Sequence, residues 1–196
     1  SGGISGGWTM VVVYENPNLP GSKYITTFDG YAGIASAAPD VDIPISGFTT
    51  LPAPFSVNAN IGIGALEGDN KIPGDGLAIN ANGSFTQLNS TVNPANNFFN
   101  SNISIDPNLF TARNPNSVNT LGWDVDLFPV TNQPNNNVIP NDATSAILRL
   151  SSTQDKYDVY FASFDVEIIE PNIVLEKKVN TVIAAELIIG EILQKS

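Results

Sequence analysis

The chain has 196 residues and a net charge of −11, with eight Lys and Arg residues, no Cys and no His. Its length suits one large domain that buries a core of its own. The missing Cys exclude disulfides and thiolate metal sites, and the missing His excludes a Ser-His-Asp or Cys-His triad. The cations are few and scattered, which argues against a nucleic-acid partner, and no apolar run reaches the length of a membrane span.

Residues 8–14, Trp-Thr-Met-Val-Val-Val-Tyr, form the first expected element. Three consecutive β-branched residues between aromatic ones favour a strand. Because the run is apolar without a break, we expect both of its faces to be buried. Residues 15–20 contain Pro17 and Pro20 and predict an exposed turn after this strand.

Short stretches with strand patterns continue along the chain and are separated by Gly, Pro and Asn turns. In 57–65 the apolar residues alternate strictly, and Gly62 and Gly64 on the other face predict close approach of a neighbouring backbone or sheet. Residues 35–47 and 92–119 are expected to be loops. The further expected strands are 24–28, 48–51, 57–65, 77–81, 84–89, 103–105, 122–130, 145–152 and 157–169. The pattern predicts an all-β chain, an antiparallel β-sandwich that is jelly-roll-like, with long Asn- and Pro-rich loops.

The end of the chain differs in character from the rest. Residues 1–171 are expected to form the sandwich module, and residues 172–196 a linker, the start of a next repeat or a terminal helix. The stretch 173–179 predicts a strand that leaves the domain. The apolar spacing in 180–196 fits an amphipathic helix or a further strand, and both alternatives stay open.

Three stretches resemble a module of large, repeat-rich bacterial surface proteins. The first, "GGWTMVVVYENPNLPGSKYITTFDGY", is similar to the pattern "GW-slvVvYe-p-lp-r-i-lfdGf". The second joins "GWDVDLFPV" to "NNVIPNDATSAILRLSSTQDKYDVYFASFDVEI" and is similar to the closing half of that module. The third, "PNIVLEKKV", resembles the start of the conserved-repeat Ig-like domains that follow such modules. The resemblance covers residues 6–179.

This resemblance implies a non-enzymatic structural or adhesive module of a large secreted protein on the bacterial cell surface. Such proteins are typical of the Bacteroidetes, where type IX secretion exports adhesins and gliding-motility proteins. The implied partners are neighbouring domains or chains of the same protein, in adhesion, gliding or filament assembly, and surface glycans. Family members usually carry further strands before the "GW" stretch, and whether strands that precede Ser1 complete the fold stays open.

Calcium is the metal that the acidic turns favour. Carboxylate, amide and backbone oxygens in turns are the ligands that Ca²⁺ prefers. Residues 67–76 supply the predicted ligands Glu67, Asp69, Asn70 and Asp75. The spacing does not match an EF-hand loop, and a polar turn without metal is the alternative. A calcium-dependent carbohydrate-binding module, with its loops at 67–76 or 92–119, is therefore the second functional prediction.

Two acidic pairs stand apart from that loop. Asp40 and Asp42 are a smaller set of possible calcium ligands. Asp124 and Asp126 lie two residues apart on one expected strand, so they share a face at about 7 Å, a spacing that a glycosidase could use. The favoured alternative is an exposed polar face that protects the strand from aggregation. We accordingly expect no enzymatic activity, with a hydrolase as the weakest hypothesis.

The Asn-rich loop contains three aromatic residues, Phe98, Phe99 and Phe110. Such side chains either anchor the loop onto the sandwich or, if exposed, form a binding patch. Anchoring is the more common reason for aromatic residues in a loop.

Overall fold

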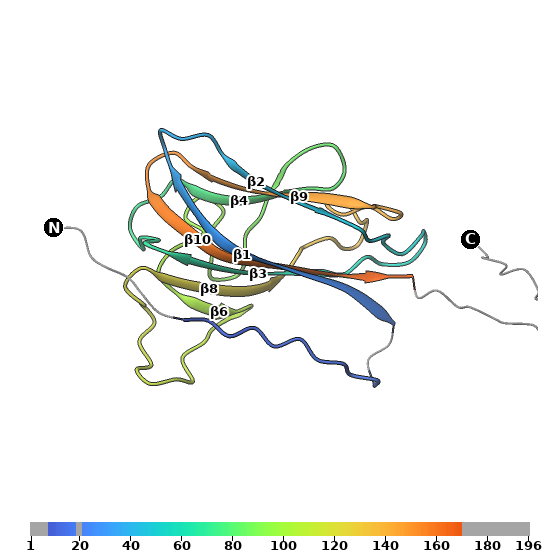
Figure 1. The fold of residues 1–196 in the computed structure, drawn as a ribbon, viewed down its shortest axis with the longest axis horizontal. Coiled ribbons are helices and arrows are strands. Elements are labelled where there is room, and N and C mark those ends of the chain that lie inside the picture. The colour runs from blue at the N-terminus through green and yellow to red at the C-terminus, as the bar shows by residue number, and fades with distance from the viewer. Residues whose placement is uncertain (1–7, 19–20, 170–196) are drawn as a thin grey trace, which may run out of the picture.

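The computed structural model describes residues 8–18 and 21–169. In these ranges the chain forms ten strands and no helix, so the described part also offers no helix suited to crossing a membrane. The strands form a six-stranded sheet, β1-β10-β3-β8-β6-β7, and a four-stranded sheet, β2-β9-β4-β5 (Figure 1). All paired strands are antiparallel except β6 and β8. The predicted all-β antiparallel sandwich is confirmed, whereas the jelly-roll arrangement stays a prediction.

The strand bounds follow the predicted pattern over most of the chain. The six-stranded sheet contains β1 (Ser22–Ala35), β10 (Lys156–Ile168), β3 (Ala59–Leu66), β8 (Trp123–Pro129), β6 (Ile103–Ile105) and β7 (Asn108–Leu109). The four-stranded sheet contains β2 (Val41–Ser46), β9 (Ser145–Ser152), β4 (Asp75–Asn80) and β5 (Thr86–Gln87).

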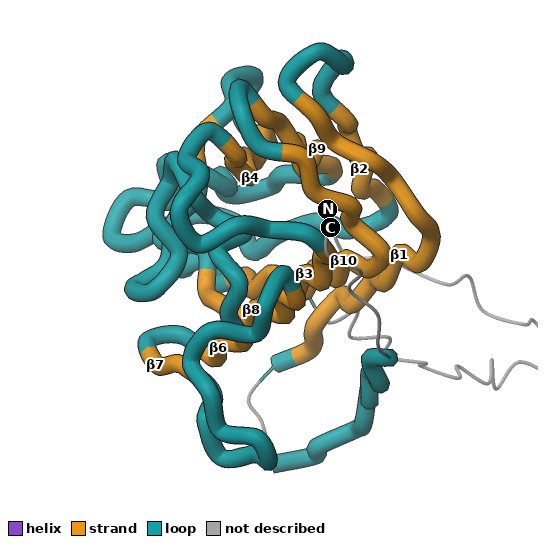
Figure 2. The backbone as a smooth tube through the Cα atoms, turned by 90° about the vertical axis from the view of Figure 1, so that its left-hand side faces the viewer, coloured by secondary structure: helices purple, strands orange, loops and turns teal. Residues whose placement is uncertain are grey.

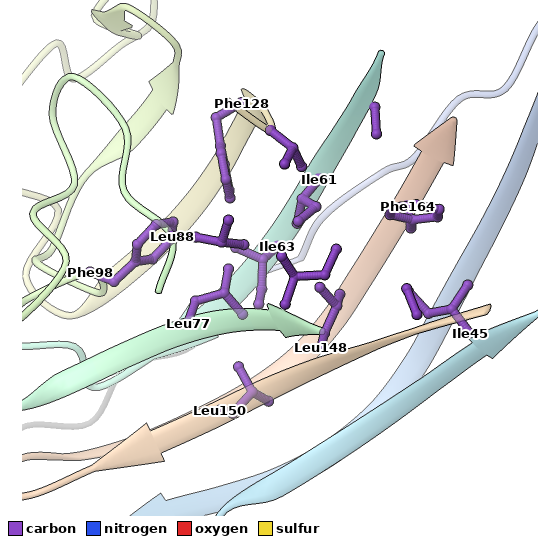
Figure 3. Close-up of a cluster of buried hydrophobic side chains, with 14 of the residues drawn as sticks. Ile45, Ile61, Ile63, Leu77, Leu88, Phe98, Phe128, Leu148, Leu150 and Phe164 are labelled. Carbon is purple, nitrogen blue, oxygen red and sulfur yellow. The ribbon is translucent and has the colours of Figure 1, made fainter. Parts of the chain in front are cut away.

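The core lies between the two sheets and consists of apolar side chains from both (Figure 3). Strands β3, β4, β9 and β10 contribute most of it through alternate residues, because successive side chains point to opposite faces of a sheet. Burying one large apolar side chain contributes about 1.5–3 kcal/mol, so this layer dominates the stability of the sandwich. Its fully buried members include Ile61, Ile63, Leu77, Ile79, Phe128, Leu148, Leu150 and Phe164.

At Gly62 and Gly64 of β3 the neighbours are side chains of the adjacent strand, and not the backbone or second sheet that was predicted. A Cβ atom at Gly62 would lie 2.5 Å from the Ser163 hydroxyl oxygen, and one at Gly64 would lie 2.6 Å from the Tyr160 ring. Both neighbours belong to β10, which pairs with β3. The two glycines therefore leave room for side chains of β10 to lie across β3.

The prediction of a buried strand at residues 8–14 is wrong. This segment joins no ladder with the described strands, and Figure 1 shows it as a loop that runs outside the sheets before β1. Trp8, Val12 and Tyr14 are 82%, 65% and 75% exposed. Strand propensity describes how well a residue fits a pleated, half-buried surface, and no described strand pairs with this segment to place it in one.

Three other expectations need correction or fall outside the structure. The loop predicted for 35–47 contains β2, which pairs with β9; its Pro44 is tolerated because β2 is an edge strand. The strand predicted for 48–51 is reduced to one bridge between Thr50 and Ile168. The predictions for 172–196 lie outside the described residues.

Asn side chains fix the long loops between the strands. Asn132 is buried, and its amide nitrogen donates hydrogen bonds to the carbonyls of Val57 and Ile139, each at 2.9 Å. Its Oδ1 accepts from the backbone amides of Val138 at 3.0 Å and Ile139 at 2.9 Å. One side chain thus satisfies four backbone groups that would otherwise need strand partners.

Candidate functional site

A cavity of about 300 Å³ lies on the outer face of the six-stranded sheet. Its lining comes from the 8–18 segment and from β1, β3, β8 and β10. The aromatic share of this lining is high for a surface site, since aromatic side chains are usually buried in the core. The lining residues are Trp8, Thr9, Asp29, Tyr31, Leu66, Trp123, Tyr160 and Phe161.

A β-bulge in β10 directs Tyr160 into this aromatic pocket. Val159 and Phe161 pair with consecutive residues of β3, which leaves Tyr160 between them as an extra residue. The ladder between β10 and β1 is irregular at the same point. Bulges turn a side chain away from the regular pleat, and Gly64 provides the space that the turned ring occupies.

Tyr160 and Trp123 form the aromatic centre of the pocket. Their ring centroids are 5.4 Å apart with an interplanar angle of 45°. The Tyr160 hydroxyl is hydrogen-bonded to the Thr9 hydroxyl at 2.8 Å. Partial burial raises the pKa of Tyr160, so its hydroxyl stays protonated. Trp8 and Tyr31 are largely exposed at the rim, where their faces are free to contact a ligand.

Polar groups at the rim can orient a ligand in the apolar pocket. Asp29 is exposed and is the one carboxylate among the lining residues. The Tyr31 hydroxyl bonds to the Asp158 carboxylate, and this contact raises the pKa of Tyr31. The pocket therefore combines aromatic faces with one acidic acceptor and protonated hydroxyls.

The predicted exposed face of Asp124 and Asp126 is wrong. The structure buries both side chains, at 0% and 1% exposure, and Asp75 of β4 is buried as well. The alternation along β8 does separate two faces, but Trp123 and Leu127 occupy the outer one. The acidic face is covered by the loop that surrounds β6.

These three buried carboxyls share one pattern of hydrogen bonding. One oxygen of each accepts a bond from the segment 99–104, and the other oxygen has no protein partner among the described residues. The donors are the Phe99 amide to Asp75 at 3.0 Å, the Asn102 amide to Asp124 at 3.1 Å and the Ser104 hydroxyl to Asp126 at 2.5 Å.

Burial changes the charge state of this group. It raises the pKa of Asp75 to about 6, that of Asp126 to about 7 and that of Asp124 well above its usual range. Desolvation is the largest cause in each case, because a low-dielectric interior disfavours the ionised form. A polymeric sugar cannot reach Asp124 and Asp126 in this conformation, which leaves the hydrolase hypothesis without an accessible acid pair.

The predicted calcium ligands lie around the same loop. Asp75 points into the core, and Glu67 begins the turn after β3 with a φ of 64°. Asp69 contacts the Asp155 carboxylate through its backbone amide at 3.1 Å, and the Asn70 side chain donates to a backbone carbonyl at 3.1 Å. The described residues contain no group of three or more acidic side chains arranged to hold a metal ion. Calcium binding stays a prediction.

Asp40 and Asp42 lie beside a cation of the protein itself. The Arg149 Nε atom is 2.7 Å from an Asp42 oxygen and 3.7 Å from an Asp40 oxygen. The hydrogen bond from Arg149 lowers the pKa of Asp42. This exposed ion pair contributes little to stability. It explains the two acids as partners of Arg149 on the surface of β2 and β9.

Two of the three aromatic residues of the Asn-rich loop, Phe98 and Phe99, anchor it as the more common alternative predicted, whereas Phe110 does not. Phe98 and Phe99 are fully buried. Phe98 lies 5.2 Å from the Phe128 ring, and Phe99 stacks on Tyr157 at 4.4 Å. Phe110 is partly exposed at the surface.

The aromatic pocket is not among the sequence predictions, because its residues come from five separate segments. Only the outward position of Trp123, opposite the two acids of its strand, could have indicated one of its members. The bulge that directs Tyr160 leaves no recognisable pattern in a strand of alternating residues. Comparison with known proteins provides no function to carry over: no protein-family model, no curated protein and no solved structure matches this chain.

Proposed function

We propose that this chain is a non-enzymatic adhesive module that binds a carbohydrate in the aromatic pocket. The observation that carries the proposal is the pairing of Trp123 and Tyr160 beside the exposed carboxylate of Asp29. Sites for small ligands are concave and mostly apolar, with a few polar groups that fix orientation. This pocket has that composition on the rigid face of a sheet.

The chemistry of the pocket favours sugars over fully apolar ligands. A pyranose ring has an apolar face of C–H groups, which stacks on aromatic rings, and a rim of hydroxyls. Asp29 can accept hydrogen bonds from such hydroxyls, and the protonated Tyr31 and Tyr160 can donate and accept hydrogen bonds. A ligand with only apolar surface would leave these polar groups without partners, which costs binding energy.

Binding without turnover fits the pocket better than hydrolysis. Glycosidases use two carboxylates about 5–10 Å apart, and Asp29 is the single acidic side chain in this lining. The chain also has no His that could act as a general base. The pocket is therefore suited to holding a sugar rather than cleaving it.

The cellular setting is part of the proposal. The resemblance of residues 6–179 to bacterial surface modules supports an extracellular location and a role in adhesion, gliding or filament assembly. The calcium-dependent version has one favourable observation among its predicted ligands, a buried Asp75 oxygen without a protein partner among the described residues. A bound cation would satisfy this oxygen, and so would a proton.

A glycan array followed by fluorescence titration tests the proposal. Both Trp residues of the chain line the pocket, so intrinsic Trp emission reports directly on a ligand there. We expect selective binding of a subset of glycans and a shift in Trp emission. Replacing Trp123 with Ala should weaken binding at least tenfold, because stacking area is lost at the centre of the site.

Phe55→Ala is the matched control, since Phe55 is an exposed aromatic side chain outside the pocket. It should leave affinity unchanged. The titration is repeated with calcium and with chelator to test the calcium-dependent version. Absence of any glycan binding, or equal affinities for Trp123→Ala and the unmodified protein, would refute the proposed site.

A further inference from the structure

We propose that residues 8–14 of one copy add as a β-strand to the free edge of β1 in a second copy of this chain. The proposal does not rest on sugar binding: in the exchanged dimer Trp8 and Thr9 leave the pocket, whose other lining residues stay in place. It follows from two features of the described residues: the segment 8–14 has strand character but joins no ladder, and β1 has no outer neighbour among the described strands.

The segment itself is the first of these features. Residues 8–14 contain no charged side chain, and all of the large apolar side chains among them are exposed. Soluble proteins normally protect such strands with charge, proline or a covering element. Here Thr9 contacts Tyr160 on the outer face of the sheet, so the segment starts over that face and does not follow the β1 edge.

The edge of β1 is the second feature. Among the described strands, β1 pairs only with β10, along 12 residue pairs. Figure 2 shows β1 and β2 as neighbouring edges on one side of the sandwich. Tyr24 and Phe28 of β1 pack against the core but remain only half-buried. A further strand beside β1 would cover this rim and complete their burial.

The two patterns match in an antiparallel register. If Tyr14 lies opposite Ser22, the face of β1 that includes Phe28 meets Trp8, and Val11 lies opposite Ile25 on the other face. Ile25 is an exposed apolar side chain of the outer face. Cross-strand pairs of aromatic and β-branched residues stabilise antiparallel sheets by about 0.2–1 kcal/mol each.

A second copy is the occupant that the surface area supports. Trp8 and Tyr14 alone bury roughly 300–500 Å² per copy when they are covered, at roughly 150–250 Å² for each aromatic side chain. A reciprocal exchange uses this area twice and approaches the roughly 800 Å² per partner of stable complexes. Exchange of an identical element between copies is a low-cost route to a dimer.

Light scattering across a concentration series, with matched substitutions, tests the exchange. We expect the unmodified chain to form dimers that dissociate on dilution. Val12→Lys should give monomers, because a charge on the inner face of the added strand is incompatible with burial. Val118→Lys is the control: Val118 is 58% exposed, against 65% for Val12, and lies in a loop outside the proposed interface. This variant should dimerise normally.

Cysteine pairing then identifies the strands, since the chain has no Cys of its own. Val11→Cys and Ile25→Cys, prepared as separate variants and mixed under mild oxidation, should form a disulfide-linked heterodimer. Val11→Cys mixed with Val118→Cys should not. A monomeric unmodified chain, a dimeric Val12→Lys variant, or a double Val11→Cys, Ile25→Cys variant that links only within one chain would each overturn the proposal.

Discussion

Replacing Asp126 with Asn should raise the stability of the domain above neutral pH and flatten its pH dependence. The carboxyl is 1% exposed, and one of its oxygens has no protein partner among the described residues. Burial raises its pKa from 3.8 to about 7, and the bonds from Ser104 and Asn93 offset only part of that rise. Asn keeps an oxygen that can accept the Ser104 hydrogen bond, but it cannot ionise.

The size of the expected change in the free energy of unfolding follows from the difference in proton affinity between the folded and the unfolded chain. A carboxyl with a raised pKa binds its proton more tightly when folded, so its contribution is fully present below pH 3.8. That contribution is lost as the pH rises toward 7. At about 1.4 kcal/mol per pKa unit, the rise from 3.8 to about 7 costs the folded state about 4 kcal/mol above pH 7.

Urea unfolding at pH 4 and at pH 8 measures this difference. The unmodified domain should lose several kcal/mol between the two values, to which Asp75 and Asp124 contribute as well, and Asp126→Asn should lose about 4 kcal/mol less. Asp142→Asn is the control, because it removes an exposed carboxyl in a loop. The stability of this variant should change between pH 4 and pH 8 as that of the unmodified protein does. Equal pH slopes for Asp126→Asn and the unmodified domain would refute the assignment of a raised pKa to a buried Asp126.

Three further substitutions test the packing that supports the pocket and the loops. Gly64→Ala should lower the free energy of unfolding by about 1–3 kcal/mol and displace the Tyr160 ring, which a change in Trp emission would show. Gly30→Ala is the control, because Gly30 has open space around it, and it should leave urea unfolding unchanged. Asn132→Ala should cost about 3 kcal/mol, because it leaves buried backbone groups unpaired, and should speed hydrogen exchange at Val138 and Ile139. Phe99→Ala should cost about 3–5 kcal/mol through the cavity left beside Tyr157; a loss below 1 kcal/mol in urea unfolding would show that the loop is not anchored there.

Periodicity was sufficient to predict the sandwich because its strands bury alternate residues. The strict alternation around Gly62 and Gly64 predicted the strand, but the close neighbours of these glycines are side chains of β10 and not a backbone or a second sheet. The same argument failed at residues 8–14, since strand propensity does not specify a partner. It also missed β2, where Pro44 in a short stretch with an Asp is typical of a loop.

The position of the acids shows a different limit of sequence reasoning. Alternation along β8 separated two faces correctly, but polarity alone placed Asp124 and Asp126 in solvent. The structure buries them because the segment 99–104 supplies backbone and hydroxyl donors, and that segment is held by Phe98 and Phe99. Both the buried acids and the aromatic pocket depend on contacts between stretches that are distant in the chain. The local residue pattern therefore could not predict either of them.

The hydrogen bonds of Asn132 have a consequence for how this fold could be re-engineered. Three of the four run within residues 132–139, and only the bond to the Val57 carbonyl reaches another part of the chain. Other side chains of the same loop bond to the segment 51–57: the Asn136 and Asn141 amides donate to the Phe55 carbonyl, and Asn141 also donates to that of Leu51. Grafted between two strands of an unrelated sandwich, residues 131–141 should therefore keep their shape only if the segment 51–57 is transferred with them.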